Sequence, residues 1–171
     1  MRISVNSRLT LKPFALEDAD TCTQLLNNPA IYERTLQIPH PYRRQHFVEW
    51  FERCRADQDP SHIQLAIRDE DERLLGGIGT HEVAPGHKAE IGYWLGEPYW
   101  GRGIMTAVVG AFREHLCREL QLVRITGTVF EGNVASARVL EKNGFEREGL
   151  LRNYYRKEGR FLDGWLYAWV A

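Results

Sequence analysis

The hydrophobic pattern of the chain changes most abruptly between residues 89 and 116. Apolar residues occupy every second position from 91 to 95, which predicts a strand. From residue 104 they recur with the spacing of a helix, at 104, 107, 108, 111, 112 and 116. The bend between the two segments contains Gly101, Arg102 and Gly103. The pattern therefore predicts a strand that leads into a helix through a glycine-rich turn.

The same periodicities place the remaining elements. Strands are expected at 8–14, 63–69, 73–83 and 123–130, and a final pair within 146–170 around the turn 157–160. Helices are expected at 16–28, 43–57 and 133–145, and two prolines predict an irregular loop at 35–42. Asn133 suits the start of the last helix and Gly144 its end. This order predicts a mixed α/β domain in which helices cover a sheet.

Composition narrows the class of protein. At 171 residues with 43% hydrophobic content, the chain is expected to form one domain, residues 1–171, with a substantial core. A net charge of -1 and scattered basic residues argue against binding to nucleic acid or to an anionic membrane. No apolar run reaches the ~20 residues of a membrane span, and the N-terminus lacks a signal-peptide core. With three widely spaced cysteines that are expected to be buried and reduced, the sequence indicates a soluble protein of the cytoplasm.

The glycine-rich bend has the features of an anion site. N–H groups at the start of a helix carry partial positive charge and lack partners within the helix. Glycine lets a phosphate approach closely because it has no Cβ, so residues 100–106 suit a phosphate, with Arg102 or Thr106 as further donors. The alternative is a plain strand-to-helix turn. Thr106 stands where a dinucleotide fingerprint has its third glycine, and the G-K-S/T ending of a P-loop is absent, so neither ligand class is expected.

Taken together, these segments resemble the GNAT superfamily of acyl-CoA-dependent N-acetyltransferases. The chain is most similar to the branch of ribosomal-protein N-terminal alanine acetyltransferases. The pyrophosphate loop of the family has the form Q/R-x-x-G-x-G/A, and WGRGIM keeps its central Gly103 but has Trp100 and Met105 at the outer positions. An aromatic residue in the first position is familiar in that branch. The segments 89–95, 133–145 and 38–42 also match, in the right order.

The resemblance implies a fold and a co-substrate. The expected fold has a central, mostly antiparallel, twisted sheet of about six to seven strands, splayed near the middle and flanked by about four helices. Acetyl-CoA is the expected co-substrate: its pantetheine arm pairs with the backbone of the splayed strand, and the N–H of Leu95 holds the thioester carbonyl. The implied cofactor-binding residues are Tyr93, Trp94, Leu95, Trp100, Gly101, Arg102, Gly103, Ile104, Met105, Thr106 and Asn133.

Two catalytic residues follow from the resemblance. Glu90 matches the general base that the family places on this strand, whereas a strand carboxylate is otherwise usually just solvated. Many members carry a tyrosine on the helix after Asn133 that protonates the departing thiolate, but Leu140 occupies that position here. Ser136 is the nearest hydroxyl and the candidate acid. The alternative is that Ser136 and Asn133 only cap their helix.

The acceptor side is less defined. His40 and Tyr42 match a loop that lines the acceptor pocket in this branch, although a surface connection with Tyr42 packed inward is about equally compatible with the sequence. No metal site is expected, because His81 and His87 lack a paired ligand spacing. Cys117 has no adjacent histidine, which disfavours a covalent acyl-cysteine.

The predicted function is transfer of an acetyl group from acetyl-CoA to a primary amine in a ternary complex. The acceptor is either a protein N-terminus or a small-molecule amine, and the protein is expected to act as a monomer or homodimer. The alternative function is a non-catalytic acyl-CoA-binding module. A nucleic-acid-binding domain is disfavoured by the charge and by the lack of a basic aromatic platform.

Overall fold

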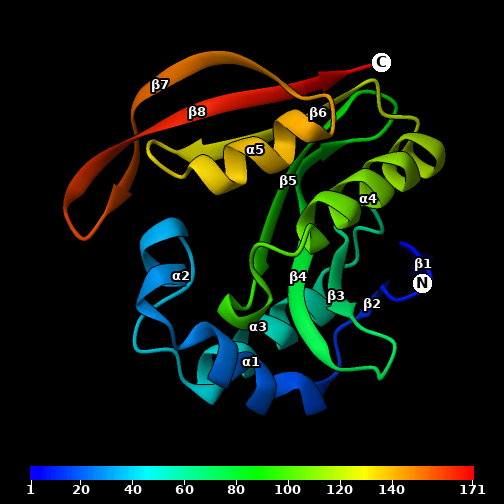
Figure 1. Cartoon of the computed structure of the whole chain (residues 1–171), viewed down its shortest axis with the longest axis vertical. Coiled ribbons are helices and arrows are strands. Elements are labelled where there is room, and N and C mark those ends of the chain that lie inside the picture. The colour runs from blue at the N-terminus through cyan, green and yellow to red at the C-terminus, as the bar shows by residue number, and fades with distance from the viewer.

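A twisted eight-stranded sheet runs through the computed structural model, which describes residues 1–171 (Figure 1). Its order is β1-β2-β3-β4-β5-β6-β8-β7, and every neighbouring pair is antiparallel except β5 and β6. The strands are β1 (Ile3–Ser4), β2 (Thr10–Pro13), β3 (Gln64–Arg68), β4 (Leu74–Ala84), β5 (Lys88–Leu95), β6 (Arg124–Phe130), β7 (Glu146–Lys157) and β8 (Arg160–Val170).

Five α-helices cover the two faces of the sheet. They are α1 (Ala19–Leu26), α2 (Pro29–Arg34), α3 (Arg44–Ala56), α4 (Ile104–Leu120) and α5 (Val134–Lys142), with single 3₁₀ turns at Leu16–Asp18 and Glu97–Tyr99. On one face, α4 and α5 pack on a core of buried residues that includes Ile67, Ile91 and Phe112. On the other face, α1 and α3 pack on a smaller core around Cys22 and Phe47.

The sheet is splayed at its centre. Pairing between β5 and β6 ends at Glu90 and Thr126, whereas β5 stays paired with β4 as far as Leu95, opposite Gly76. Beyond Glu90, therefore, one edge of β5 faces a gap instead of a strand. The predicted α/β fold with a splayed, mostly antiparallel sheet is confirmed.

Two short elements are absent from the sequence prediction. Strand β1 has only two residues, too few to show an alternating pattern. Helix α2 has six residues, and its signal lies in its cap: Asn28 accepts from the N–H groups of Ala30 and Ile31, and Pro29 occupies the first turn. These two additions account for eight strands and five helices where about six to seven and about four were expected. None of the helices is long and apolar enough to span a lipid bilayer.

Candidate active site

The bend after β5 presents a row of unpaired backbone donors. The N–H groups from Gly101 to Thr106 donate to no acceptor within the chain. Gly101 and Gly103 both have φ of 73°, in the left-handed region that favours glycine, and Gly103 is the N-cap of α4. A Cβ built on Gly103 would meet nothing within 4 Å, so the space in front of these donors is open. The bend therefore offers an open row of backbone donors suited to an anionic group such as a phosphate.

The side chains around the bend hold it in place. Trp100 Nε1 donates to the carbonyl of Leu95 at 2.7 Å, which ties the bend to the end of β5. The Arg102 guanidinium lies 5.9 Å from the centroid of the Tyr99 ring and is otherwise exposed. The side chain of Met105 is buried in the core, so Met105 presents only its N–H group at the bend.

Successive residues of β5 point to opposite faces of the sheet. Tyr93 and Leu95 pack with the core under α4 and α5. Trp94 packs with the core under α1 and α3, over Gly77 of β4. Glu90 lies on the same face as Trp94, because side chains alternate along a strand. The strand that ends at the gap thus carries a carboxylate on one face and a tyrosine on the other.

The open edge of β5 belongs to the main chain of Tyr93 and Leu95. Gly96 donates its N–H to Leu75 of β4, and backbone groups alternate in direction along a strand, so Trp94 also points toward β4. Tyr93 and Leu95 point the other way, toward the gap. The main chain of Trp94 is therefore paired with Gly77 of β4, so Trp94 lines the cleft with its side chain only.

Glu90 lies at the inner end of the gap. Its Oε1 accepts a hydrogen bond of 3.1 Å from Thr128 Oγ1 on β6. His81 of β4 is its cross-strand neighbour. A Cβ on Gly92 would lie 2.9 Å from His81 Nε2, so glycine at this position leaves room for the imidazole. Burial, and to a lesser extent the charge of Glu90, raise the pKa of Tyr155 to about 12.

Ser136 approaches the gap from the other face. It lies in the first turn of α5, where Asn133 Oδ1 accepts from its N–H at 3.4 Å, so the predicted cap is present. The Ser136 Oγ lies 2.8 Å from the hydroxyl of Tyr93. Burial raises the pKa of Tyr93 to about 12, although the hydrogen bond with Ser136 lowers it.

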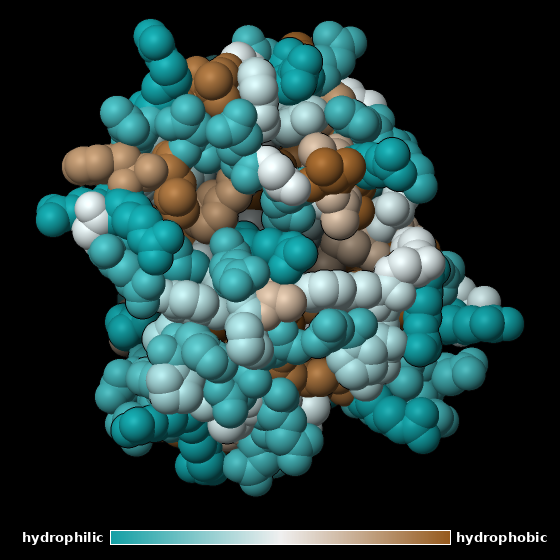
Figure 2. All heavy atoms as spheres, turned by 60° about the vertical axis from the view of Figure 1, so that its left-hand side comes forward, coloured by the Kyte–Doolittle hydropathy of each residue, from teal (hydrophilic) through white to brown (hydrophobic).

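A cleft of about 1570 Å³ joins these features. It is lined by Glu90, Ser136, Asn133, Tyr93 to Leu95 and much of the bend. Figure 2 shows hydrophobic side chains recessed between hydrophilic ones on this side of the molecule. Glu90 and Ser136 come from opposite faces of the sheet and line one opening.

The predicted acceptor residues lie in different surroundings. Tyr42 lines the cleft but is only 7% exposed, and its N–H donates to Asn27 Oδ1 at 3.1 Å. His40 is exposed and lies outside the lining. Its ring is tilted by 36° against that of Tyr32, with 5.7 Å between the ring centroids. The roles of both residues in acceptor binding stay predictions.

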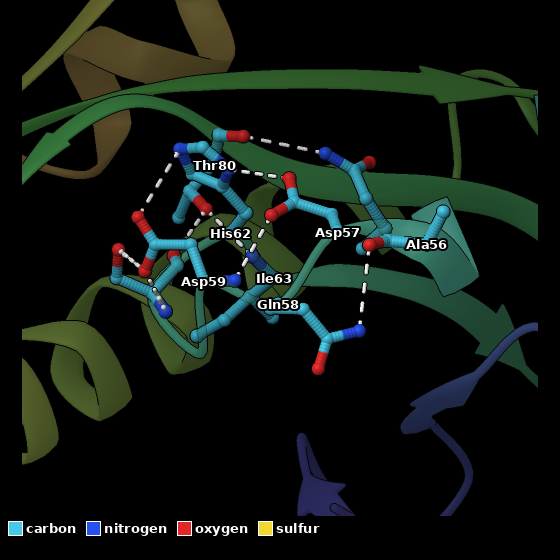
Figure 3. Close-up of polar contacts among 9 residues, drawn as sticks. Ala56, Asp57, Gln58, Asp59, His62, Ile63 and Thr80 are labelled. Carbon is cyan, nitrogen blue, oxygen red and sulfur yellow. Dashed lines mark hydrogen bonds and ion pairs between the residues drawn. The ribbon is translucent and has the colours of Figure 1, made fainter. Parts of the chain in front are cut away.

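Periodicity and motifs do not reveal two further groups, one that lines the cleft and one that contacts its wall. At the turn from α3 to β3, His62 Nδ1 lies 2.6 Å from Asp57 Oδ2, and this hydrogen bond raises the pKa of His62 (Figure 3). The neighbouring Thr80 accepts from Ile63 N–H at 2.8 Å, which fixes the turn on β4. On the opposite side, Lys157 at the end of β7 reaches across to α2.

Lys157 joins the β7–β8 hairpin to the wall of the cleft. Its Nζ donates to the carbonyls of Tyr32 and Thr35, the latter at 2.7 Å. It also lies 3.7 Å from the centroid of the Tyr32 ring. No local signal marks this contact, because its partners are separated by more than a hundred positions.

The three cysteines lie in different surroundings. All three are free, but only Cys22 is buried as expected, whereas Cys54 and Cys117 are partly exposed. Complete or partial burial raises the pKa of each thiol. Cys54 borders the cleft and Cys117 lies on α4. No group of three or more potential metal ligands is present.

Comparison with known proteins agrees with this geometry. Residues 8–146 match the acetyltransferase (GNAT) domain family. The L-amino acid N-acetyltransferase AaaT of Escherichia coli (strain K12) is 29% identical over 168 residues, which cover 96% of this chain and 99% of AaaT. The putative ribosomal N-acetyltransferase YdaF of Bacillus subtilis (strain 168) is also 29% identical over 168 residues, 94% of this chain and 87% of YdaF.

A solved structure shares the fold. RimL, a ribosomal L7/L12 alpha-N-protein acetyltransferase in complex with coenzyme A, matches with a TM-score of 0.85 and 23% identity, over 99% of this chain and 98% of RimL. The expected similarity to ribosomal-protein acetyltransferases is confirmed by these relatives. The chain belongs to the GNAT family and is an acetyl-CoA-dependent N-acetyltransferase.

Proposed function

We propose that the chain transfers the acetyl group of acetyl-CoA to a primary amine by direct attack, with both substrates bound at once. The observation that supports this most is the placement of the two candidate catalytic side chains. Glu90 projects from the face that α1 and α3 cover, and Ser136 from α5 on the other face, yet both line one cleft. Two substrates that enter from opposite faces meet between these side chains.

Acetyl-CoA is proposed to bind on the α4–α5 face. The unpaired N–H groups from Gly101 to Thr106 receive its pyrophosphate. The main chain of Tyr93 and Leu95 pairs with the pantetheine arm, beside Asn133. The carbonyl of Leu95 is already bound by Trp100, which leaves its N–H to hold the thioester oxygen and stabilise the oxyanion.

Glu90 is proposed to take the proton from the attacking nitrogen, directly or through a water molecule. An amine attacks a thioester only when it is neutral. At neutral pH, deprotonation costs roughly 4–5 kcal/mol for a lysine-like amine and about 1 kcal/mol for an α-amine. The hydrogen bond from Thr128 keeps the carboxylate of Glu90 at the gap.

The acceptor is proposed to be an α-amine, either of a free amino acid or of a protein N-terminus. AaaT and YdaF are equally similar to this chain, and their names give an L-amino acid and a ribosomal acceptor. An α-amine is common to both classes. It also needs the least help from a general base.

The test is a panel of acceptors assayed for acetyl-CoA-dependent thiol release, with mass spectrometry of the product. The panel contains free L-amino acids, peptides that begin with alanine or serine, and spermidine. We expect release that requires an α-amine and yields an N-acetylated product. If acetyl-CoA binds but no α-amine in the panel releases thiol, the proposed acceptor class is wrong.

A further inference from the structure

The hydroxyl of Ser136 has an unusual partner for a residue in a helix. Serine in a helix often donates to a carbonyl of the preceding turn. Here Oγ makes only one hydrogen bond, of 2.8 Å, and its partner is the hydroxyl of Tyr93 on β5. The Tyr93 hydroxyl also lies 3.3 Å from the carbonyl oxygen of Ser136. One phenol, from the strand beneath α5, therefore fixes the side chain of Ser136.

This pair has two possible arrangements of its protons. Either Ser136 donates to Tyr93 and Tyr93 donates to the Ser136 carbonyl, or Tyr93 donates to Ser136 Oγ. A hydroxyl has one proton and can both donate and accept. In the second arrangement the Ser136 proton is free to point into the cleft. A negative charge in the gap favours that arrangement, because it presents a donor to the anion.

We propose that Tyr93 is a positioning residue, whose hydroxyl donates to Ser136 Oγ and so directs the Ser136 proton at the sulfur of CoA. This rests on the proposed function, which places that sulfur in the gap. When the C–S bond breaks, its electron pair moves to sulfur, and Ser136 stabilises the thiolate by a hydrogen bond. The thiolate then takes a proton from solvent, while the proton of the amine leaves through Glu90.

Tyr93 is suited to donate a hydrogen bond and not to supply the proton itself. Its pKa is raised by burial to about 12, so it stays protonated at neutral pH. Helix α5 has no tyrosine at the position where many family members carry one, because Leu140 stands there and is 1% exposed. The Tyr93 ring packs on the main core, so a phenylalanine at this position keeps the packing and loses only the hydroxyl.

The test measures the pKa of the CoA thiol when it is bound to the protein. Thiolate absorbance is followed against pH for the CoA complex, with the desulfo-CoA complex as reference to subtract tyrosine ionisation. The wild type should lower the thiol pKa relative to free CoA. In Tyr93→Phe and in Ser136→Ala the bound thiol pKa should rise by about half a unit to one unit, the size of one ordinary hydrogen bond.

Steady-state kinetics gives a second readout. Tyr93→Phe should lower kcat about threefold to tenfold, with little change in the KM for acetyl-CoA. The double variant Tyr93→Phe/Ser136→Ala should be no slower than Ser136→Ala, because both changes remove the same effect. Tyr167→Phe is the matched control: this buried tyrosine also binds α5, through Glu141 at 3.3 Å, but lies outside the cleft lining.

The outcomes separate the two proposals. If Tyr93→Phe binds CoA normally and its bound thiol pKa equals that of the wild type, the positioning role is wrong. It is also wrong if Tyr167→Phe shifts the thiol pKa as much, since the effect then reflects the stability of α5. If the wild type does not bind CoA at all, the proposed function fails first. A raised thiol pKa confined to Tyr93→Phe and Ser136→Ala supports the proposal.

Discussion

The two faces of β5 are constructed in different ways. On the α4–α5 face, the bend and the start of α4 follow the strand directly, so the proposed CoA site is almost continuous in sequence and consists largely of backbone groups. On the α1–α3 face, the wall of the cleft combines α2, the loop 35–42, α3 and β7. Its contacts join side chains that are far apart in the chain. On the proposed function, acetyl-CoA is therefore recognised by local main-chain geometry and the acceptor by side chains that long-range packing brings together.

The largest expected effect is at Glu90, where the two faces meet. General-base catalysis typically contributes ~10²–10⁴-fold, so Glu90→Gln should lower kcat/KM within that range at neutral pH. The loss should shrink as pH rises, because more of the amine is already neutral. For an α-amine the recovered part of the loss is roughly fivefold to tenfold and returns near pH 8, because deprotonation costs only about 1 kcal/mol. For a lysine-like amine the recovered part is larger and returns only near pH 10.

The control for this variant is Glu82→Gln, a second carboxylate that lines the same cleft. It should leave the rate and its pH dependence nearly unchanged. If the loss in Glu90→Gln is constant across the whole pH range, Glu90 positions the acceptor or supports β5, and another group is the base.

The next largest effect is expected at the bend on the α4–α5 face, where acetyl-CoA is proposed to bind. Gly103→Val places a branched side chain in the open space before the unpaired N–H groups, and its φ of 73° adds strain. Acetyl-CoA affinity measured by calorimetry should fall by more than about tenfold, equivalent to roughly 1.4 kcal/mol. Gly86→Val is the matched control, because Gly86 also has positive φ and open space but lies at the other end of β5. Equal affinity in a folded Gly103→Val protein would show that the phosphates bind elsewhere.

A smaller effect is expected on the α1–α3 face, where the proposed function places the acceptor. Lys157→Met removes the donor that holds α2 to the hairpin and keeps an apolar side chain of similar length. The KM for the acceptor should rise by a few-fold, up to about tenfold, while acetyl-CoA affinity stays the same. Arg156→Met, at the exposed neighbouring position, should change neither. A loss of acetyl-CoA affinity in Lys157→Met would mean that the two faces are not independent.

The smallest effect is expected at the cysteines. Because burial raises the pKa of the Cys54 and Cys117 thiols, neither is a ready thiolate at neutral pH. The double variant Cys54→Ala/Cys117→Ala should keep its turnover within about twofold, since direct attack needs no acyl-cysteine. Abolished turnover with intact folding and acetyl-CoA binding would instead point to a covalent intermediate.

Features built from neighbouring residues can be predicted from the sequence, whereas contacts between distant segments cannot. The change from strand to helix periodicity, with Gly101 and Gly103 between, predicts the bend, and Asn133 predicts the start of α5 as observed. These signals are local. The Tyr93–Ser136 hydrogen bond is not, because it depends on how α5 packs against β5. The contact of Lys157 with α2 depends on the whole sheet order.

The gap between β5 and β6 is only partly predictable from the sequence. Periodicity places β5 and β6 but does not say that their pairing stops at Glu90 and Thr126. That feature was expected only from resemblance to a family. Tyr42 shows the same limit, since its sequence position fits a pocket residue and a buried core residue equally, and the structure places it 7% exposed at the edge of both.

The most direct test of transfer across the gap is initial-rate kinetics with acetyl-CoA and an accepted α-amine both varied. Direct attack in a ternary complex predicts double-reciprocal lines that intersect, because both substrates must be bound before any product leaves. Parallel lines, together with an acetylated protein isolated in the absence of acceptor, would show a ping-pong reaction and contradict the account.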